Sequence, residues 1–124
     1  MLMNAPYLLK EILDALKDLV EKGEEHTIYI NKIPITEEDR IAILDVLGEG
    51  QITIRMESTT YPVEWRETGI SGVWIGVFFD REKKPILETI EVTTFPKLAA
   101  AQKEDILESI RKLEERLKAI LKDL

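Results

Sequence analysis

The sequence predicts an α+β fold: a mainly antiparallel sheet of four or five strands, with the N-terminal and C-terminal helices packed on one face. Near both ends of the chain, apolar residues recur every three or four positions, which is the spacing of amphipathic helices. From residue 51 to residue 94 the apolar period changes to two, which is typical of strands. Short polar turns separate these strands, and short turns join antiparallel neighbours.

The first predicted element is a helix from Asn4 to Lys22. Asn4 suits the N-cap position, Pro6 is tolerated in the first turn, and Gly23 supplies a C-terminal stop. Steps of three and four residues give the helix one broad apolar face, made of Leu8, Leu9, Ile12, Leu13, Leu16, Leu19 and Val20. We expect this face to pack on the sheet.

A short strand from Thr27 to Asn31 follows, and then a short helix between the first two strands. Thr36 begins this helix, and Asp39 stands three residues later, as a capping box requires. Acidic residues in the first turn also favour the positive end of the helix dipole. The apolar residues predicted to line the buried face of the helix are Ile41, Leu44 and Leu47.

The middle of the chain predicts a series of strands joined by turns. In each strand, apolar side chains alternate with others, so neighbouring residues point to opposite faces of the sheet. The predicted segments are, in order, a strand around Ile52–Met56, a turn at Ser58–Pro62, a strand around Val63–Arg66, a strand at Val73–Phe79, a turn at Asp80–Pro85 and a strand at Ile86–Thr94.

The chain closes with a predicted helix from Lys103 to Lys122. Its apolar residues step alternately by four and three, like the seam of a coiled coil: Ile106, Ile110, Leu113, Leu117, Ile120 and Leu124. The repeat lasts for fewer than three heptads. We therefore expect the helix to pack on the chain's own sheet or on the first helix, and a contact between two copies is the alternative.

Composition limits the class of protein. A length of 124 residues predicts one domain (1–124), and 44% hydrophobic residues are enough for a buried core. The formal net charge of -7 repels phosphate groups, which argues against nucleic acid and anionic membranes as partners. The chain has no cysteine, so disulfides, thiolate metal sites and thiol catalysis are excluded.

The sequence also favours a cytoplasmic protein. No apolar run approaches the roughly 20 residues of a membrane-spanning helix, and the N-terminus lacks the pattern of a secretory leader. Glu, Lys, Ile and Leu are abundant, whereas Asn and Gln occur only at Asn4, Asn31, Gln51 and Gln102. This balance resembles that of heat-adapted proteins, so we expect a thermophilic origin.

Few side chains are suited to catalysis or to metal binding. His26 is the only histidine, whereas zinc sites take three or four ligands, so we interpret it as a surface residue. Gly48–Gly50 follows a helix C-terminus, which is the wrong end for a phosphate, and the two glycines suit a helix stop and the start of a strand. Alternation places Glu64, Glu88 and Glu91 on a solvent face, and a catalytic pair of carboxylates is the enzyme alternative. We expect no metal, no cofactor and no enzyme activity.

The aromatic residues of the middle strands are candidates for a binding surface. Alternation puts Trp74, Gly76 and Phe78 on one face, opposite the branched apolar residues of the same strand. Helices could cover both faces, or one face could meet a partner at a notch left by Gly76. Because aromatic and arginine side chains often anchor interfaces, we predict a docking surface around Trp65, Arg66 and Glu67.

Several short motifs follow one another between about Leu8 and Leu121. They are Ile33-Pro34-Ile35-Thr36 with Asp39, Leu47-Gly48-Glu49-Gly50, Glu67-Thr68, Gly72-Val73-Trp74, Ile90-Glu91-Val92 and Pro96. In this order and spacing they resemble the conserved C-terminal region of the HupH/HyaF hydrogenase expression proteins. The chain departs from the family pattern at Ile75, where a second aromatic residue is usual.

The resemblance implies a maturation chaperone for nickel–iron hydrogenases and not an enzyme. It implies binding to the iron–sulfur small subunit before that subunit joins the large one, or to other hydrogenase maturation proteins. Glu49 and Thr68 belong to the motifs and therefore join the predicted partner surface. Members of the family are often longer, with more than one such region, so we also expect a homodimer. The alternative is a general interaction or dimerisation domain with no link to hydrogenase.

Overall fold

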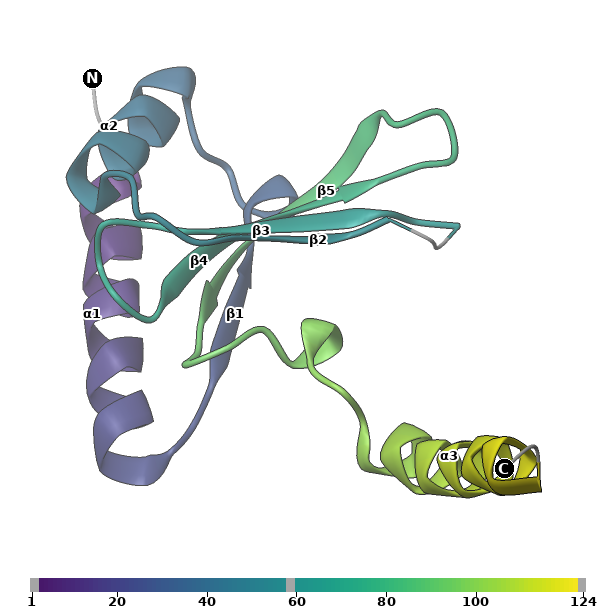
Figure 1. The fold of residues 1–124 in the computed structure, drawn as a ribbon. Helices are drawn as coiled ribbons and strands as arrows, with labels where there is room; N and C mark the ends of the chain where they lie inside the picture. Colours follow the sequence, from purple (N-terminus) through teal and green to yellow (C-terminus); the bar gives the residue numbers. More distant parts are fainter. Residues whose placement is uncertain (1–2, 58–59, 123–124) are drawn as a thin grey trace.

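The computed structural model describes residues 3–57 and 60–122, which form a five-stranded sheet with three α-helices (Figure 1). All neighbouring strands pair antiparallel, in the spatial order β1-β5-β4-β3-β2. The strands are β1 (His26–Tyr29), β2 (Thr53–Met56), β3 (Val63–Glu67), β4 (Val73–Phe79) and β5 (Pro85–Val92). Of the predicted turn at Ser58–Pro62, Ser58 and Thr59 lie outside the described residues.

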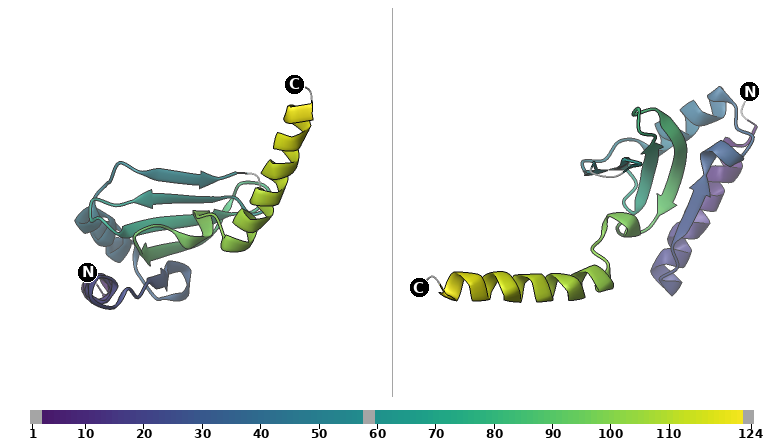
Figure 2. Two further views of the ribbon diagram at one scale, coloured as in Figure 1. Left: turned by 60° about the horizontal axis from the view of Figure 1, so that its bottom comes forward. Right: turned by 90° about the vertical axis from the view of Figure 1, so that its right-hand side faces the viewer.

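Two helices cover one face of the sheet, α1 (Ala5–Lys22) and α2 (Glu37–Leu47), and the main core lies between them and the strands (Figures 1 and 2). Its buried apolar residues are Ala5, Leu8, Ile12, Ala15, Ile28, Ile43, Leu47, Val73, Ile90 and Val92. The α+β class, the antiparallel meander and the helix between the first two strands are thus confirmed. β1 ends earlier than predicted because the chain enters a 3₁₀ turn, η1 (Ile30–Lys32).

The buried face of α2 differs from the prediction. The helix buries Asp39, Ile43 and Leu47, whereas Ile41 is 60% exposed and Leu44 is 41% exposed. A carboxylate therefore occupies the first inward position, and the buried residues repeat at steps of four. Apolar spacing alone could not indicate this rotation, because it assigns an acidic residue to the solvent side.

Asp39 joins the two helices. It completes the predicted capping box, with its backbone N–H donating to Thr36 Oγ1 (3.0 Å) and its Oδ2 accepting from the Thr36 N–H (3.1 Å). The same carboxylate accepts the N–H groups of Met3, Asn4 and Ala5 at the start of α1. Burial by itself raises the pKa of Asp39, but these backbone hydrogen bonds outweigh it and hold the pKa well below its ordinary value.

The C-terminal helix, α3 (Lys103–Lys122), does not pack on the sheet, contrary to the prediction. None of its residues is buried, and it projects away from the rest of the chain (Figures 1 and 2). One face of the sheet is already covered by α1 and α2. On the other face, the short 3₁₀ segment η2 (Lys97–Ala99) contributes Ala99 to the packing, and the extended residue Ala100 follows it.

Candidate functional site

The residues predicted to bind a partner lie on opposite faces of the sheet. Trp65 is paired with Gly76 and Arg66 with Ile75, so the two neighbours on β3 point in opposite directions. The single docking surface predicted around Trp65 and Arg66 is therefore not formed, because adjacent strand residues face opposite sides of the sheet. On the face that carries the helices, a common cleft is lined by four of the predicted residues, Glu49, Arg66, Glu67 and Thr68. Of these, Glu67 lies at the end of β3 opposite Trp74, so alternation turns its side chain away from that face, and its Oε2 accepts the Gly72 N–H (3.1 Å). On the other face, the predicted residues that pack together are Trp65, Trp74 and Phe78.

The cleft lies between α2, the loop after it and strands β2 to β5, and has a volume of about 470 Å³. We refer to it as the α2 cleft. Besides the four predicted residues, charged side chains from three elements line it: Arg40 of α2, Glu64 of β3 and Glu88 of β5. Its lining therefore holds two arginines and four glutamates, so the cleft shares the acidic balance of the whole chain but offers basic groups as well.

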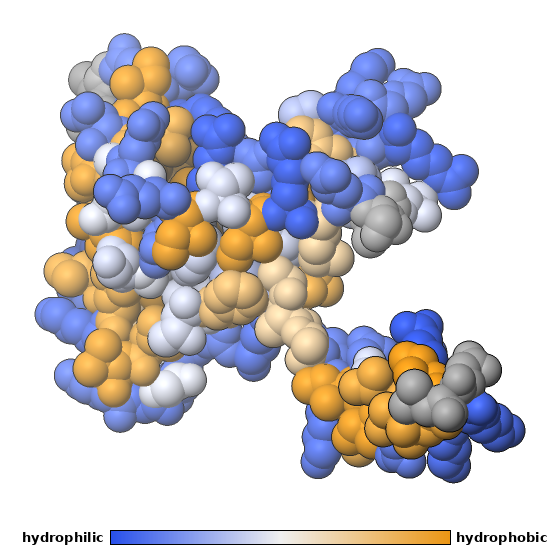
Figure 3. All heavy atoms as spheres, in the orientation of Figure 1, coloured by the Kyte–Doolittle hydropathy of each residue, from blue (hydrophilic) through white to orange (hydrophobic). Residues whose placement is uncertain are grey.

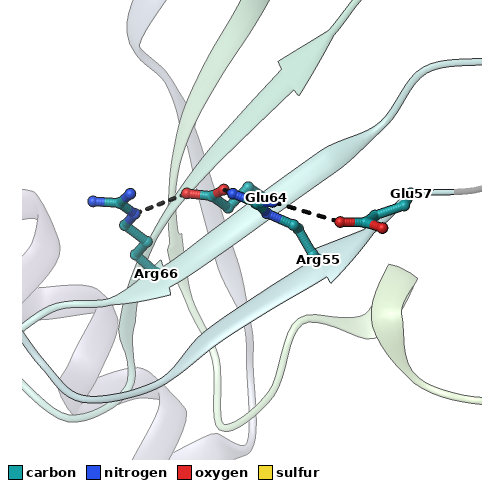
Figure 4. Close-up of polar contacts among 4 residues, drawn as sticks. All are labelled: Arg55, Glu57, Glu64 and Arg66. Carbon is teal, nitrogen blue, oxygen red and sulfur yellow. Dashed lines mark hydrogen bonds and ion pairs between the residues drawn. The ribbon is translucent and has the colours of Figure 1, made fainter. Parts of the chain in front are cut away.

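Glu64 lies between two arginines (Figure 4). Arg66 Nε donates to Glu64 Oε1 (2.8 Å) and Arg55 Nε donates to Glu64 Oε2 (3.0 Å). The hydrogen bond from Arg66 has the largest effect and lowers the pKa of Glu64; burial opposes it, and Arg55 lowers the pKa further. The Arg66 side chain is 70% exposed, and its two terminal nitrogens have no partner among the described residues. Arg66 can therefore bind a further carboxylate or carbonyl.

A second ion pair connects α2 to the sheet. Arg40 forms two hydrogen bonds with Glu88, one of them between Nη2 and Oε2 at 2.8 Å. The bond to Glu88 raises the pKa of Arg40, and burial opposes this rise. The prediction that Glu64 and Glu88 face solvent is wrong, since their side chains are only 13% and 17% exposed. Each is held there by an arginine, and the lowered pKa of Glu64 is the opposite of what a general acid needs.

The loop after α2 is fixed to the end of β3. Gly48 ends the helix with a φ of 70°, and the N–H of Gly50 donates to the carbonyl of Glu67 (3.1 Å). A Cβ at Gly50 would lie 2.5 Å from the carbonyl oxygens of both Glu67 and Thr68, so only glycine allows this approach. Glu49 is consequently held exposed at the cleft, with no ion pair among the described residues.

The opposite face carries a second core around two tryptophans. Trp65 is 0% exposed and donates from Nε1 to Glu91 Oε2 (2.8 Å), which also accepts the hydroxyl of Thr89 (2.8 Å). Trp74 is 2% exposed and donates to a backbone carbonyl. The predicted notch at Gly76 is filled, since an added Cβ would lie 2.4 Å from Thr89 Oγ1 and 2.7 Å from Glu91 Oε2.

Burial therefore removes Trp65 and Trp74 from the surface that a partner could touch in this conformation. Phe78 is only partly buried and packs edge-on against Trp65, with 6.3 Å between ring centroids. The expectation that Glu91 faces solvent is also wrong, because its carboxylate is drawn inward by the indole N–H and the threonine hydroxyl. These aromatic residues stabilise the sheet beneath the α2 cleft.

Other candidate chemistry stays at the surface. The His26 side chain is 43% exposed, as predicted, with Nε2 2.6 Å from Glu11 Oε2. Within the described part of the chain, no group of three or more histidine, aspartate or glutamate residues is placed to hold a metal ion. No helix in residues 3–57 and 60–122 combines the length and the apolar content that a bilayer crossing requires.

Comparison with known proteins agrees with the motifs in the sequence. Residues 2–120 match the family described as HupH hydrogenase expression protein, C-terminal conserved region. The chain belongs to this family. A solved structure of the hydrogenase expression protein HupH from Thiobacillus denitrificans ATCC 25259 superposes with a TM-score of 0.85 at 27% identity, covering 96% of this chain and 99% of the other.

Curated members of the HupH family show similar identity over nearly the whole chain. The hydrogenase expression/formation protein HupH of Rhodobacter capsulatus is 35% identical and is matched over 95% of this chain and 42% of its own length. HoxQ of Azotobacter vinelandii, also named a hydrogenase expression/formation protein, is 34% identical, and the hydrogenase-1 operon protein HyaF of Escherichia coli (strain K12) is 31% identical; each covers 92% of this chain. The chain spans about two fifths of the length of these relatives.

Proposed function

We propose that this HupH-family domain acts in hydrogenase maturation by binding a precursor protein, specifically the iron–sulfur small subunit before assembly. The observation that carries the proposal is the family match over residues 2–120, joined by relatives whose names refer to hydrogenase expression or formation. The α2 cleft supports it, because its free arginine nitrogens and exposed carboxylate are suited to binding a polypeptide.

The edge of the sheet next to the cleft supplies a second binding element. β2 is the last strand in the sheet order, and no described strand pairs with its outer side. The Ile52 carbonyl accepts the Glu67 N–H (2.9 Å), so the alternation of an antiparallel pair turns the backbone groups of Thr53 and Arg55 outward. An extended precursor segment could add to β2 as a further strand. Its side chains would then reach Arg66 and Glu49.

The domain binds without catalysing a reaction, holds no cofactor of its own, and works in the cytoplasm, where precursors are made. One histidine and no cysteine leave few reactive side chains in the chain, which supports binding over chemistry. Binding of other maturation proteins belongs to the same proposal, and we propose separately that the domain forms a homodimer.

Binding of the purified small-subunit precursor to the purified domain tests the proposal, measured by biolayer interferometry. We expect Arg66→Glu to weaken binding by about 10-fold or more, because it reverses a charge that is exposed in the cleft. Arg81→Glu is the matched control: it makes the same change at an exposed arginine in the turn between β4 and β5, outside the cleft lining.

The possible results separate function from site. If both variants lose binding equally, or both keep it, the α2 cleft is not the binding site, but the proposed function is not refuted. Failure of the unmodified domain to bind any hydrogenase precursor would refute the hydrogenase role and favour a general interaction domain. A cooperative urea transition followed by tryptophan fluorescence would show that each variant is folded.

A further inference from the structure

α3 exposes an apolar surface that its own chain does not cover. Seven of its large apolar side chains are between 48% and 68% exposed: Ile106, Leu107, Ile110, Leu113, Leu117, Ile120 and Leu121. Figure 3 shows apolar residues gathered on this helix, at a distance from those of the sheet and of α1. Most of the stability of a protein helix comes from packing of its apolar face, none of α3 is buried, and contiguous exposed apolar surface marks an interaction site. The helix therefore needs a partner.

The spacing of these residues indicates that the partner is another helix. Five of them are spaced alternately by four and three residues, which is the spacing of side chains that pack between those of a facing helix: Ile106, Ile110, Leu113, Leu117 and Ile120. A pleated sheet does not match this spacing. α1 is unavailable as that partner, because its apolar face already lies in the main core. The partner helix therefore belongs to another chain.

The distribution of charge along α3 favours antiparallel pairing with a second copy of the same helix. After Lys103, the first turn of α3 carries Glu104 and Asp105, and basic residues lie toward its other end, Lys118 and Lys122 among them. Antiparallel pairing of two copies places each acidic end beside a basic end, whereas parallel pairing aligns like charges. Arg111 in the middle is paired within its own helix, to Glu108 and Glu115.

Area and shape are compatible with such a pair. Covering seven half-exposed large side chains removes several hundred Å² per chain, comparable to the roughly 800 Å² per partner of a standard-size interface. Since α3 projects away from the sheet, an antiparallel pair holds the two sheets at opposite ends of the helices (Figure 2). We propose that α3 is a dimerisation helix, which pairs two copies of this chain as an antiparallel coiled coil and leaves both α2 clefts open. This inference does not depend on the hydrogenase role.

Sedimentation equilibrium of the full chain tests the pairing between about 1 and 100 µM. We expect the unmodified chain to dimerise and Leu113→Glu to raise the dissociation constant by at least about 100-fold, because each dimer loses two buried leucines. Leu113→Ala, which keeps helix propensity, is expected to raise it by about 10-fold. Ala119→Glu adds the same charge outside the apolar seam and is expected to leave the dimer unchanged.

Two results would overturn the proposal. An unmodified chain that stays monomeric over this range would show that α3 is covered by its own chain or by another protein. A dimer that survives Leu113→Glu as well as it survives Ala119→Glu would show that the contact lies elsewhere. Fluorescence of the two buried tryptophans, both outside α3, reports whether the sheet of each variant is intact.

Cross-linking tests the direction of pairing without background, because the chain has no cysteine. A mixture of Glu104→Cys and Lys118→Cys chains is expected to form mixed cross-linked dimers with a short bismaleimide. Glu104→Cys alone is expected to form none, since antiparallel pairing puts the two cysteines on the order of 20 Å or more apart. Efficient cross-linking of Glu104→Cys alone would instead show a parallel pair and refute the charge argument.

Discussion

Replacement of Gly50 by alanine tests how firmly the loop after α2 is fixed to the end of β3. The added Cβ would lie 2.5 Å from two carbonyl oxygens, and these are backbone atoms that cannot rotate away. Overpacking of this kind costs about 1–3 kcal/mol. Displacing the loop also breaks the hydrogen bond from Gly50 to Glu67 (3.1 Å), whose net contribution is about 1 kcal/mol. We therefore expect Gly50→Ala to lower the free energy of unfolding by about 2–4 kcal/mol.

Urea unfolding followed by tryptophan fluorescence measures this loss, because both tryptophans are buried and become exposed on unfolding. The midpoint of thermal unfolding should fall by roughly 10 °C. Gly23→Asn is the control: Gly23 has a φ of 69° and no atom within 4 Å of an added Cβ, and asparagine tolerates left-handed backbone. We expect that control to change stability by no more than about 0.5 kcal/mol.

An alanine at position 50 that costs no more than the Gly23→Asn control would refute the close approach of the two segments. The same outcome would remove the reason for Glu49 to stand at the α2 cleft, because the loop would then be free to move. A large loss of stability with an unchanged urea m-value is the expected pattern, since the unfolded states of the two chains expose the same surface.

Three further predictions concern the core and the whole chain. The pKa of Asp39 is lower in the folded chain than its ordinary 3.8, so its ionised form stabilises the fold above about pH 4 and this contribution is lost as the pH falls further. The urea midpoint of Asp39→Asn should therefore be lower than that of the unmodified chain at pH 7, and it should change less as the pH falls below about 4. Curves of midpoint against pH that run parallel for the two proteins would contradict this. Trp65→Phe removes the indole N–H that donates to Glu91 and should lower the free energy of unfolding by about 2 kcal/mol, measured by urea unfolding with the fluorescence of Trp74. An unchanged urea midpoint would mean that the hydrogen bond contributes nothing. If the chain is heat-adapted, circular dichroism should give a thermal midpoint above the ~45–65 °C of mesophilic domains, and a midpoint inside that range would reject the prediction.

Local rules predicted most of the elements because each depends on residues close together in the chain. The left-handed glycine after Lys22, the capping box at Thr36 and the alternation along β4 involve separations of a few residues and are found where they were expected. Alternation along β3 separates Trp65 from Arg66, so the single docking surface predicted around them is not formed. The same rules failed for α2, because they treat Asp39 as a solvent residue and cannot know that the start of α1 supplies it with three N–H donors.

The sequence by itself determined the element types, the antiparallel sheet, the family and the small number of reactive side chains, since periodicity, motif order and composition are properties of the chain alone. Only the tertiary structure decided which faces are covered. It buried Trp65 and Trp74, gathered Glu49, Arg66, Glu67 and Thr68 into one cleft, and left α3 without cover. The physical reason is that an amphipathic pattern shows that a face must be buried, whereas the surface that buries it is set by contacts between residues far apart in sequence, or by another chain.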